Sequence, residues 1–120
     1  MSSYKDLAVY QIAFQLAREV HLLMLKLPKQ EAYELASQVR RSAQSVRANI
    51  VEGYGRRIYK ADYVRFLANA HASLLETISH LEMLKELYPS LISNDLLNRY
   101  EELGGKIYNY MAYVQKKWRT

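Results

Sequence analysis

The sequence lacks cysteine and is poor in glycine and proline, with four and two residues respectively among its 120. The absence of cysteine excludes disulfide frameworks, thiolate metal sites and cysteine nucleophiles. The longest apolar run, Leu22–Leu25, is too short to span a bilayer, and the polar, charged segment Ser2–Asp6 does not resemble a secretory signal. We therefore expect one compact domain over residues 1–120, located in the cytoplasm and without a membrane partner.

Helical periodicity runs through the whole chain, and no segment shows the strict alternation of a half-buried strand. The apolar spacing predicts four helices, over about Lys5–Leu27, Gln30–Glu52, Lys60–Tyr88 and Asn94–Trp118. The connections between them are short, so consecutive helices are expected to run antiparallel. The predicted fold class is all-α, as an antiparallel up-down-up-down four-helix bundle.

A few polar residues and glycines predict how these helices begin, end or bend. Ser3 with Asp6 has the spacing of a capping box, and Ser93 is the expected cap of the fourth helix. Gly53 is expected to end the second helix in a left-handed cap. The pair Gly104-Gly105 weakens the fourth helix and predicts either a kink or a close approach of another helix.

The first predicted helix carries two apolar stripes. One stripe recurs at three- and four-residue steps and consists of Val9, Ala13, Leu16, Val20, Leu23 and Leu27. The second set, Leu7, Phe14 and Leu25, points to nearly the opposite side. A helix in an isolated bundle needs only one stripe, so the second set predicts an oligomer interface.

The net charge of +5 is confined to one short window of the sequence. Residues 38–65 contain Arg40, Arg41, Arg47, Arg56, Arg57, Lys60 and Arg65, opposed only by Glu52 and Asp62, while the cations and carboxylates elsewhere balance. A local excess of this kind indicates a polyanionic partner, with nucleic acid ahead of an anionic membrane. The alternative is a solvated face that keeps the protein soluble.

The two flanks of the second predicted helix differ in character. One flank carries Ser42, Ser45, Asn49 and Glu52, bordered by Arg41, and predicts an interhelical or intersubunit polar layer, with a ligand site as the alternative. The other flank and the turn that follows supply the candidates for phosphate contact: Arg40, Arg47, Arg56, Arg57, Lys60 and Arg65, with Tyr54 and Tyr59 among them. Arginine holds phosphate in bidentate fashion and tyrosine stacks on unpaired bases, so the mixture predicts RNA or single-stranded DNA binding.

Catalysis finds little support in the sequence. None of His21, His71 and His80 has the spacing of a metalloprotease or lies in a nucleophile motif. Glu76 and His80 lie four residues apart and are better explained as a surface pair than as two ligands of a metal. We expect no enzyme activity, no catalytic residue, no metal and no cofactor.

A long central segment resembles a known family. Residues 38–56 read QVRRSAQSVRANIVEGYGR, which closely resembles the central motif of the 23S ribosomal RNA intervening-sequence proteins. The opening YKDLAVYQ (residues 4–11), the pair Phe66-Leu67, Ala70 and the segment SLLE (residues 73–76) are also similar to that family. The resemblance covers nearly the whole chain.

The resemblance implies properties that the periodicity does not supply. Members are small bacterial four-helix-bundle proteins that can assemble into ring-like homopentamers. They are similar in architecture to the accessory protein of diversity-generating retroelements, a basic pentamer that binds nucleic acid and a reverse transcriptase. A homopentamer is therefore expected here from resemblance alone.

Two functional hypotheses of different classes remain open. The first is a non-enzymatic homo-oligomer that binds RNA or DNA through phosphate contacts, with low sequence specificity. The second is a protein–protein scaffold or accessory subunit whose arginines form salt bridges with a partner or between subunits. Replacing Arg40 and Arg47 by alanine separates them, because loss of the oligomer indicates structural arginines.

Overall fold

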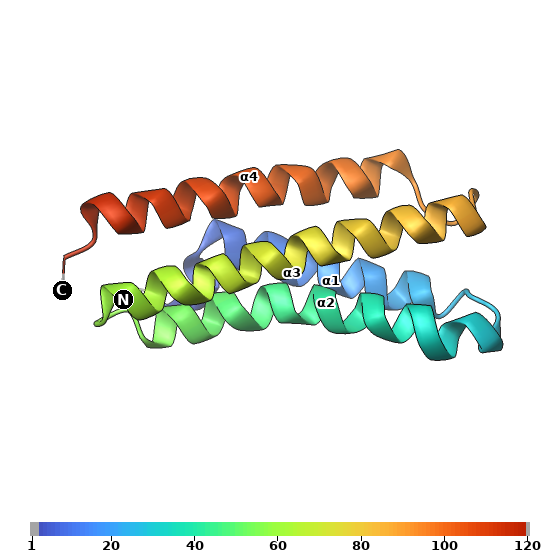
Figure 1. Cartoon of the computed structure of the whole chain (residues 1–120), viewed down its shortest axis with the longest axis horizontal. Helices are drawn as coiled ribbons and strands as arrows, with labels where there is room; N and C mark the ends of the chain where they lie inside the picture. The colour runs from blue at the N-terminus through green and yellow to red at the C-terminus, as the bar shows by residue number, and fades with distance from the viewer. Residues whose placement is uncertain (1–2, 120) are drawn as a thin grey trace.

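The computed structural model describes residues 3–119, except for the side chains of residues 31 and 32. It contains a short 3₁₀ helix, η1 (Tyr4–Asp6), and four α-helices: α1 (Ala8–Met24), α2 (Lys29–Gly55), α3 (Lys60–Leu87) and α4 (Asn94–Lys117). The four helices lie side by side along the long axis of a body that measures 48 × 23 × 21 Å (Figure 1). The predicted all-α four-helix bundle is confirmed, and no strand occurs in the part of the chain described.

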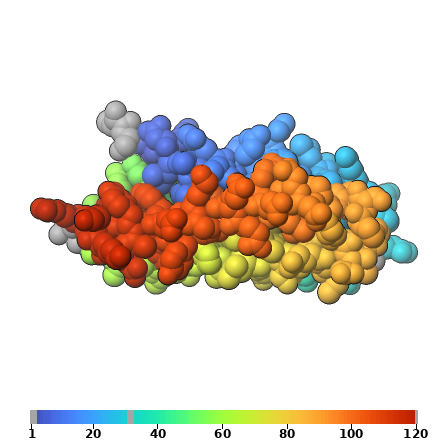
Figure 2. Space-filling model, turned by 90° about the horizontal axis from the view of Figure 1, so that it is seen from above, coloured from blue at the N-terminus to red at the C-terminus, as the bar shows by residue number. Residues whose placement is uncertain are grey.

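The helices form a cycle in which each packs against two others. α2 contacts α1 and α3, and α4 contacts α3 and α1, whereas α1 and α3 lie diagonally across the bundle with their backbones apart. Figure 2 shows α4 running between α1 on one side and α3 on the other. The diagonal helices α1 and α3 run in the same direction, and their outer faces point away from each other.

The core consists of the stripes that the periodicity predicts. Side chains of all four helices meet there, and the largest that are fully buried include Tyr63, Tyr100, Leu16, Met24 and Ile50. Within the predicted stripe of the first helix, Leu23 is only half-buried and Met24 takes the core position. Burial of such aliphatic and aromatic surface is the main force that holds a bundle together.

The predicted starts and stops of the helices require two corrections. The capping box of Ser3 and Asp6 is present, but it caps η1, and α1 begins only at Ala8. Gly53 does not end α2, which continues to Gly55, and no glycine has a positive φ. Gly53 instead lies against α3, because a Cβ there would come within 3.1 Å of Phe66 Cβ.

The fourth helix bears out two expectations about its local structure. The Ser93 hydroxyl accepts a hydrogen bond from the Leu96 amide at 3.1 Å and caps α4. The double glycine does not interrupt the helix. Gly104 is buried against Leu74 of α3, and a Cβ added to Gly104 would lie 3.0 Å from Leu74 Cδ2. Of the two expected explanations, close helix approach is therefore the one observed.

Candidate nucleic-acid interface

The end of α4 is anchored on the turn between α2 and α3. The Trp118 indole N–H donates a hydrogen bond to the Arg57 carbonyl oxygen at 2.8 Å, and its ring meets Tyr63 edge-on with centroids 5.2 Å apart. At the same end, the ring of Tyr4 in η1 lies 6.5 Å from that of Tyr54 in α2. Three segments that are distant in sequence therefore meet at one end of the bundle, at the left in Figure 1.

This end of the molecule collects most of the excess positive charge. Its cations come from η1, the α2–α3 turn, the start of α3 and the end of α4; they are Lys5, Arg56, Arg57, Lys60, Arg65, Lys116, Lys117 and Arg119. Three carboxylates, Asp6, Glu52 and Asp62, lie among them, which leaves a net charge of +5. We call this set the basic end.

The ion pairs within the basic end are exposed and weak. Arg56 Nε lies 2.8 Å from Glu52 Oε2, and Arg56 Nη1 lies 3.8 Å from Asp62 Oδ2. Arg65 Nη2 lies 3.6 Å from Asp62 Oδ1. About half of each arginine side chain is solvent-accessible, and exposed pairs of this kind contribute little to stability. Both guanidinium groups therefore remain accessible to a competing phosphate.

Arg57 is held more firmly than its neighbours. Its Nη1 donates a hydrogen bond to the Tyr54 carbonyl oxygen at 2.9 Å, and its guanidinium lies 4.0 Å from the centre of the Tyr54 ring. The side chain is half-buried. Of the candidates for phosphate contact, Arg57 is the one most involved in supporting the turn itself.

Exposed aromatic side chains accompany these cations. Tyr59 in the turn is 65% exposed, and Tyr113 near the end of α4 is 50% exposed and stacks on Tyr110. Tyr63 is buried and shares a 2.7 Å hydrogen bond with the Tyr110 hydroxyl, and burial raises the pKa of Tyr63. Tyr59 and Tyr113 thus offer faces for stacking, while Tyr63 belongs to the core.

Arg40 and Arg47 lie apart from the basic end. They project from the side of α2 next to α1, and Arg47 Nε donates to Gln44 Oε1 at 3.0 Å. Arg47 lines a cavity of about 480 Å³ together with Phe14 and Arg18 of α1. Arg40 is sixteen residues before Arg56, or about 24 Å along the helix. Among the described side chains, no ion pair involves either arginine.

The polar flank of α2 faces α3, and its small residues make the contacts. Thr77 Oγ1 donates to Ser42 Oγ at 2.8 Å, and the hydroxyls of Ser45 and Ser73 lie 2.8 Å apart. Asn49 bonds back to Ser45 within α2. The other two residues assigned to this layer are exposed: Glu52 pairs with Arg56, and Arg41 lines a polar cavity of about 520 Å³ with Glu76 and His80.

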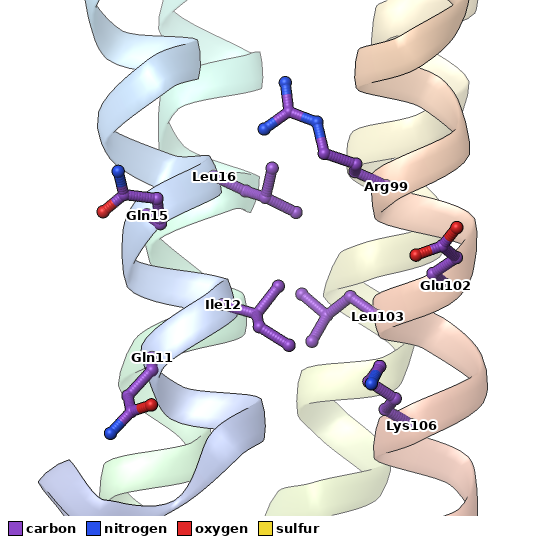
Figure 3. A pocket seen from close by; sticks show the side chains of 8 residues that line it. All are labelled: Gln11, Ile12, Gln15, Leu16, Arg99, Glu102, Leu103 and Lys106. Atoms are coloured by element: carbon purple, nitrogen blue, oxygen red, sulfur yellow. The ribbon is translucent and has the colours of Figure 1, made fainter.

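The seam between α1 and α4 is the least closely packed of the four. A groove of about 460 Å³ opens there over Ile12, Leu16 and Leu103, with a polar rim that includes Glu102 and Lys106 (Figure 3). Next to it, both Arg99 terminal nitrogens bond to the Glu19 carboxylate, at 2.5 and 2.8 Å. The hydrogen bond from Arg99 lowers the pKa of Glu19.

A family model ties this bundle to known proteins. The model of the 23S rRNA-intervening sequence proteins matches residues 5–109. The chain belongs to this family. A solved structure has the same fold: a protein with unknown function from the S23 ribosomal protein family of Bacteroides thetaiotaomicron VPI-5482, 20% identical, with a TM-score of 0.69 over 92% of this chain and 100% of that one. None of the curated proteins matches the sequence.

The family and this neighbour indicate no enzyme class. No group of three His, Cys, Asp or Glu side chains that could hold a metal occurs within the described residues. Over the same residues, no helix is long and apolar enough to cross a membrane.

Sequence reasoning missed half of the basic end of this intervening-sequence protein. Lys5, Lys116, Lys117 and Arg119 lie outside the charged window and join the other cations only through the fold. A signal was available, because α4 runs antiparallel to α3 at similar length and must therefore end where α3 begins. Helix length also shows that Arg40 lies far from the α2–α3 turn, because about four turns of α2 separate the two.

Proposed function

We propose that this protein is a non-enzymatic, cytoplasmic homo-oligomer that binds RNA or DNA through phosphate contacts, with little sequence preference. The observation that carries the proposal is the basic end, where eight cations from three separate parts of the chain meet beside exposed tyrosines. Phosphate contacts of this kind release condensed counterions and carry no base information. Strong salt dependence is the expected signature.

Single strands suit the basic end better than duplexes. The exposed ring faces of Tyr59 and Tyr113 lie among the cations, and base–aromatic stacking contributes about 1–3 kcal/mol per base without strong sequence preference. Stacking requires unpaired bases, so affinity for a single strand should exceed that for a duplex of equal length.

Self-association supplies the affinity that one small cluster lacks. Phe14 of α1 and Leu25 directly after it have side chains that are 47% and 66% exposed. A bundle that stays monomeric does not need to expose this apolar surface to water. An oligomer repeats the basic end in space, and several weak contacts then act together on one polyanion.

Fluorescence anisotropy with a labelled single-stranded RNA, titrated at several salt concentrations, tests the proposal. The triple variant Lys60→Gln/Lys116→Gln/Lys117→Gln should lower the slope of log K against log salt by about 2, at about 0.7 per lost contact. The matched control, Lys26→Gln/Lys29→Gln/Lys106→Gln, removes the same charge elsewhere and should leave the slope unchanged. No binding at low salt, or equal losses in both variants, would refute it.

A scaffold function is the second candidate, and the placement of Arg40 and Arg47 supports it. Arg47 lines a cavity with the exposed apolar side chains of Phe14 and Leu22, and Arg40 lies about two turns earlier on the same side of α2, which is a setting for salt bridges to a protein partner. The double variant Arg40→Ala/Arg47→Ala distinguishes the roles. Loss of RNA binding with the oligomer intact assigns the arginines to phosphate, and loss of the oligomer assigns them to an interface.

A further inference from the structure

Two arginines of the basic end converge on a single aromatic ring. The guanidinium carbon of Arg56, directly after α2, lies 5.1 Å from the centre of the Phe66 ring. The guanidinium carbon of Arg65 in α3 lies 4.4 Å from the same ring centre. Both distances are within the range of a cation–π interaction. We call Arg56 and Arg65 the arginine pair.

The position of this ring depends on a close approach of α2 and α3. A Cβ added to Gly53 would lie 3.1 Å from Phe66 Cβ and 3.2 Å from Tyr63 Cδ1. Tyr63 is fully buried, whereas Phe66 is half-buried. The packing of two helices therefore holds the Phe66 ring, and with it the place where the two guanidinium groups meet.

One carboxylate already bridges the arginine pair. Arg56 Nη1 lies 3.8 Å from Asp62 Oδ2, and Arg65 Nη2 lies 3.6 Å from Asp62 Oδ1. Each carboxylate oxygen therefore faces one arginine, at a distance longer than the roughly 2.7–2.9 Å of a charge-assisted hydrogen bond. A small anion with more oxygens and more charge than a carboxylate fits this arrangement better than Asp62 does.

A nucleic acid offers two kinds of phosphate to such a pair. An internal phosphate is a diester with a single negative charge, so exchanging the Asp62 carboxylate for it replaces one single charge by another. A terminal phosphate is a monoester with three free oxygens and a charge of about −1.5 to −2 at pH 7. It can accept hydrogen bonds from both guanidinium forks at once. The arginine pair is therefore matched to the end of a strand and not to its interior.

We infer that the arginine pair binds a terminal phosphate monoester of a single-stranded nucleic acid. The contacts with Asp62 are partly exposed and weak, so displacing this carboxylate costs little. The Tyr59 amide donates a hydrogen bond to the Arg56 carbonyl oxygen at 2.9 Å, so the exposed Tyr59 ring belongs to the same turn and can stack on the terminal base. This inference rests on the proposed function and adds the class of strand, one that carries a 5′ or 3′ phosphate.

Fluorescence anisotropy tests the inference with an internally labelled single-stranded RNA that has a 5′ phosphate, a 3′ phosphate or hydroxyls at both ends. We expect one phosphorylated form to bind about 10-fold more tightly than the hydroxyl-ended form, through the added charge-assisted hydrogen bonds. The form that is preferred identifies the end that the protein recognises. A hydroxyl-ended strand one nucleotide longer carries its extra phosphate as a diester, and its affinity should stay within about 2-fold of the shorter strand.

The double variant Arg56→Lys/Arg65→Lys keeps the net charge and removes both guanidinium forks. Its ratio of affinities for phosphorylated and hydroxyl-ended RNA should fall from about 10 to about 1, and circular dichroism verifies that it is folded. The matched control, Arg18→Lys/Arg41→Lys, makes the same replacement at two exposed arginines away from the basic end and should keep the wild-type ratio.

The outcomes distinguish this inference from the proposed function on which it rests. Equal affinities of the wild type for all strands, or an undiminished ratio in Arg56→Lys/Arg65→Lys, would overturn the inference and leave salt-dependent RNA binding in place. Failure of the wild type to bind any of the strands at low salt would overturn both.

Discussion

The basic end and the side of α2 next to α1 both contain arginines from one stretch of sequence, yet they differ in their surroundings. At the basic end, Arg56 and Arg65 already pair weakly with nearby carboxylates, are about half exposed, and lie 5.1 and 4.4 Å from the centre of the Phe66 ring. On the side of α2 next to α1, Arg47 lines a cavity with the exposed apolar side chains of Phe14 and Leu22. Neither Arg47 nor Arg40 has an ion pair among the described residues. Arginines from one stretch of sequence therefore lie in two different settings, an exposed polar surface at the basic end and a partly apolar cavity beside α1.

The substitution Phe14→Glu should disrupt the exposed apolar surface of α1 and leave the basic end intact. A carboxylate among the exposed apolar side chains of α1 opposes burial of that surface against a second copy, while the exposed position of Phe14 leaves the helix stable. We expect monomers with unchanged helicity and an RNA affinity about 100-fold weaker, because multivalency is lost. Size exclusion with light scattering and RNA anisotropy measure the two effects. Elution like the wild type would show that the interface lies elsewhere.

The opposite experiment, Trp118→Ala, should disrupt the basic end and leave the exposed apolar surface of α1 intact. It removes the hydrogen bond to the Arg57 carbonyl and the ring contact with Tyr63. We expect a loss of about 2 kcal/mol in unfolding free energy, or about 8 °C in Tm, since the indole is only half-buried. RNA affinity should fall as Lys116 and Lys117 separate from the turn, with the oligomer retained. A thermal melt and anisotropy report these changes; unchanged RNA affinity would exclude the end of α4 from the site.

A third substitution, Glu19→Gln, lies outside both regions and should have the smallest effect. The hydrogen bond from Arg99 lowers the pKa of Glu19 in the folded protein. The ionised Glu19–Arg99 pair therefore stabilises the folded protein at pH values above the pKa of Glu19 in the unfolded chain, near 4.5. This stabilisation is lost as the pH falls through the pKa of Glu19 in the folded protein. The pair is about one-third exposed, so we expect less than about 1 kcal/mol at neutral pH. Denaturant melts from pH 7 to pH 3 should show a difference in unfolding free energy between wild type and variant that is largest at pH 7 and shrinks as the pH falls below about 4.5, with RNA binding unaffected.

The fold was predictable from the sequence because the helices obey a single period and have short connections. The role of Gly53 was not predictable, because only its close contact with Phe66 explains why a glycine occurs inside α2 and does not end it. Leu7 was assigned to the exposed stripe of the first helix, but it lies before α1 and packs against the core, while Leu22 joins Phe14 and Leu25 at the surface. Such outcomes depend on where the first helix begins, which periodicity leaves open.

The candidate site was only partly predictable, because counting charges along the sequence does not show which of them the fold brings together on the surface. It found Arg56, Lys60 and Arg65 but grouped them with Arg40, which the fold places about 24 Å along the helix from Arg56. It omitted Lys116 and Lys117, which are adjacent in space through the Trp118 anchor. The apolar surroundings that distinguish the two sets of arginines come from a neighbouring helix and become visible only when α1 packs on α2.

Lysine footprinting of the unmodified protein tests most directly whether the basic end binds nucleic acid. Acetylation of the free protein and of its complex with a single-stranded RNA, read by mass spectrometry, compares each lysine in the two states. The account predicts protection of Lys60, Lys116 and Lys117, with Lys26 and Lys29 at the opposite end labelled equally in both. Equal labelling at both ends, or protection at Lys26 and Lys29 alone, would contradict it.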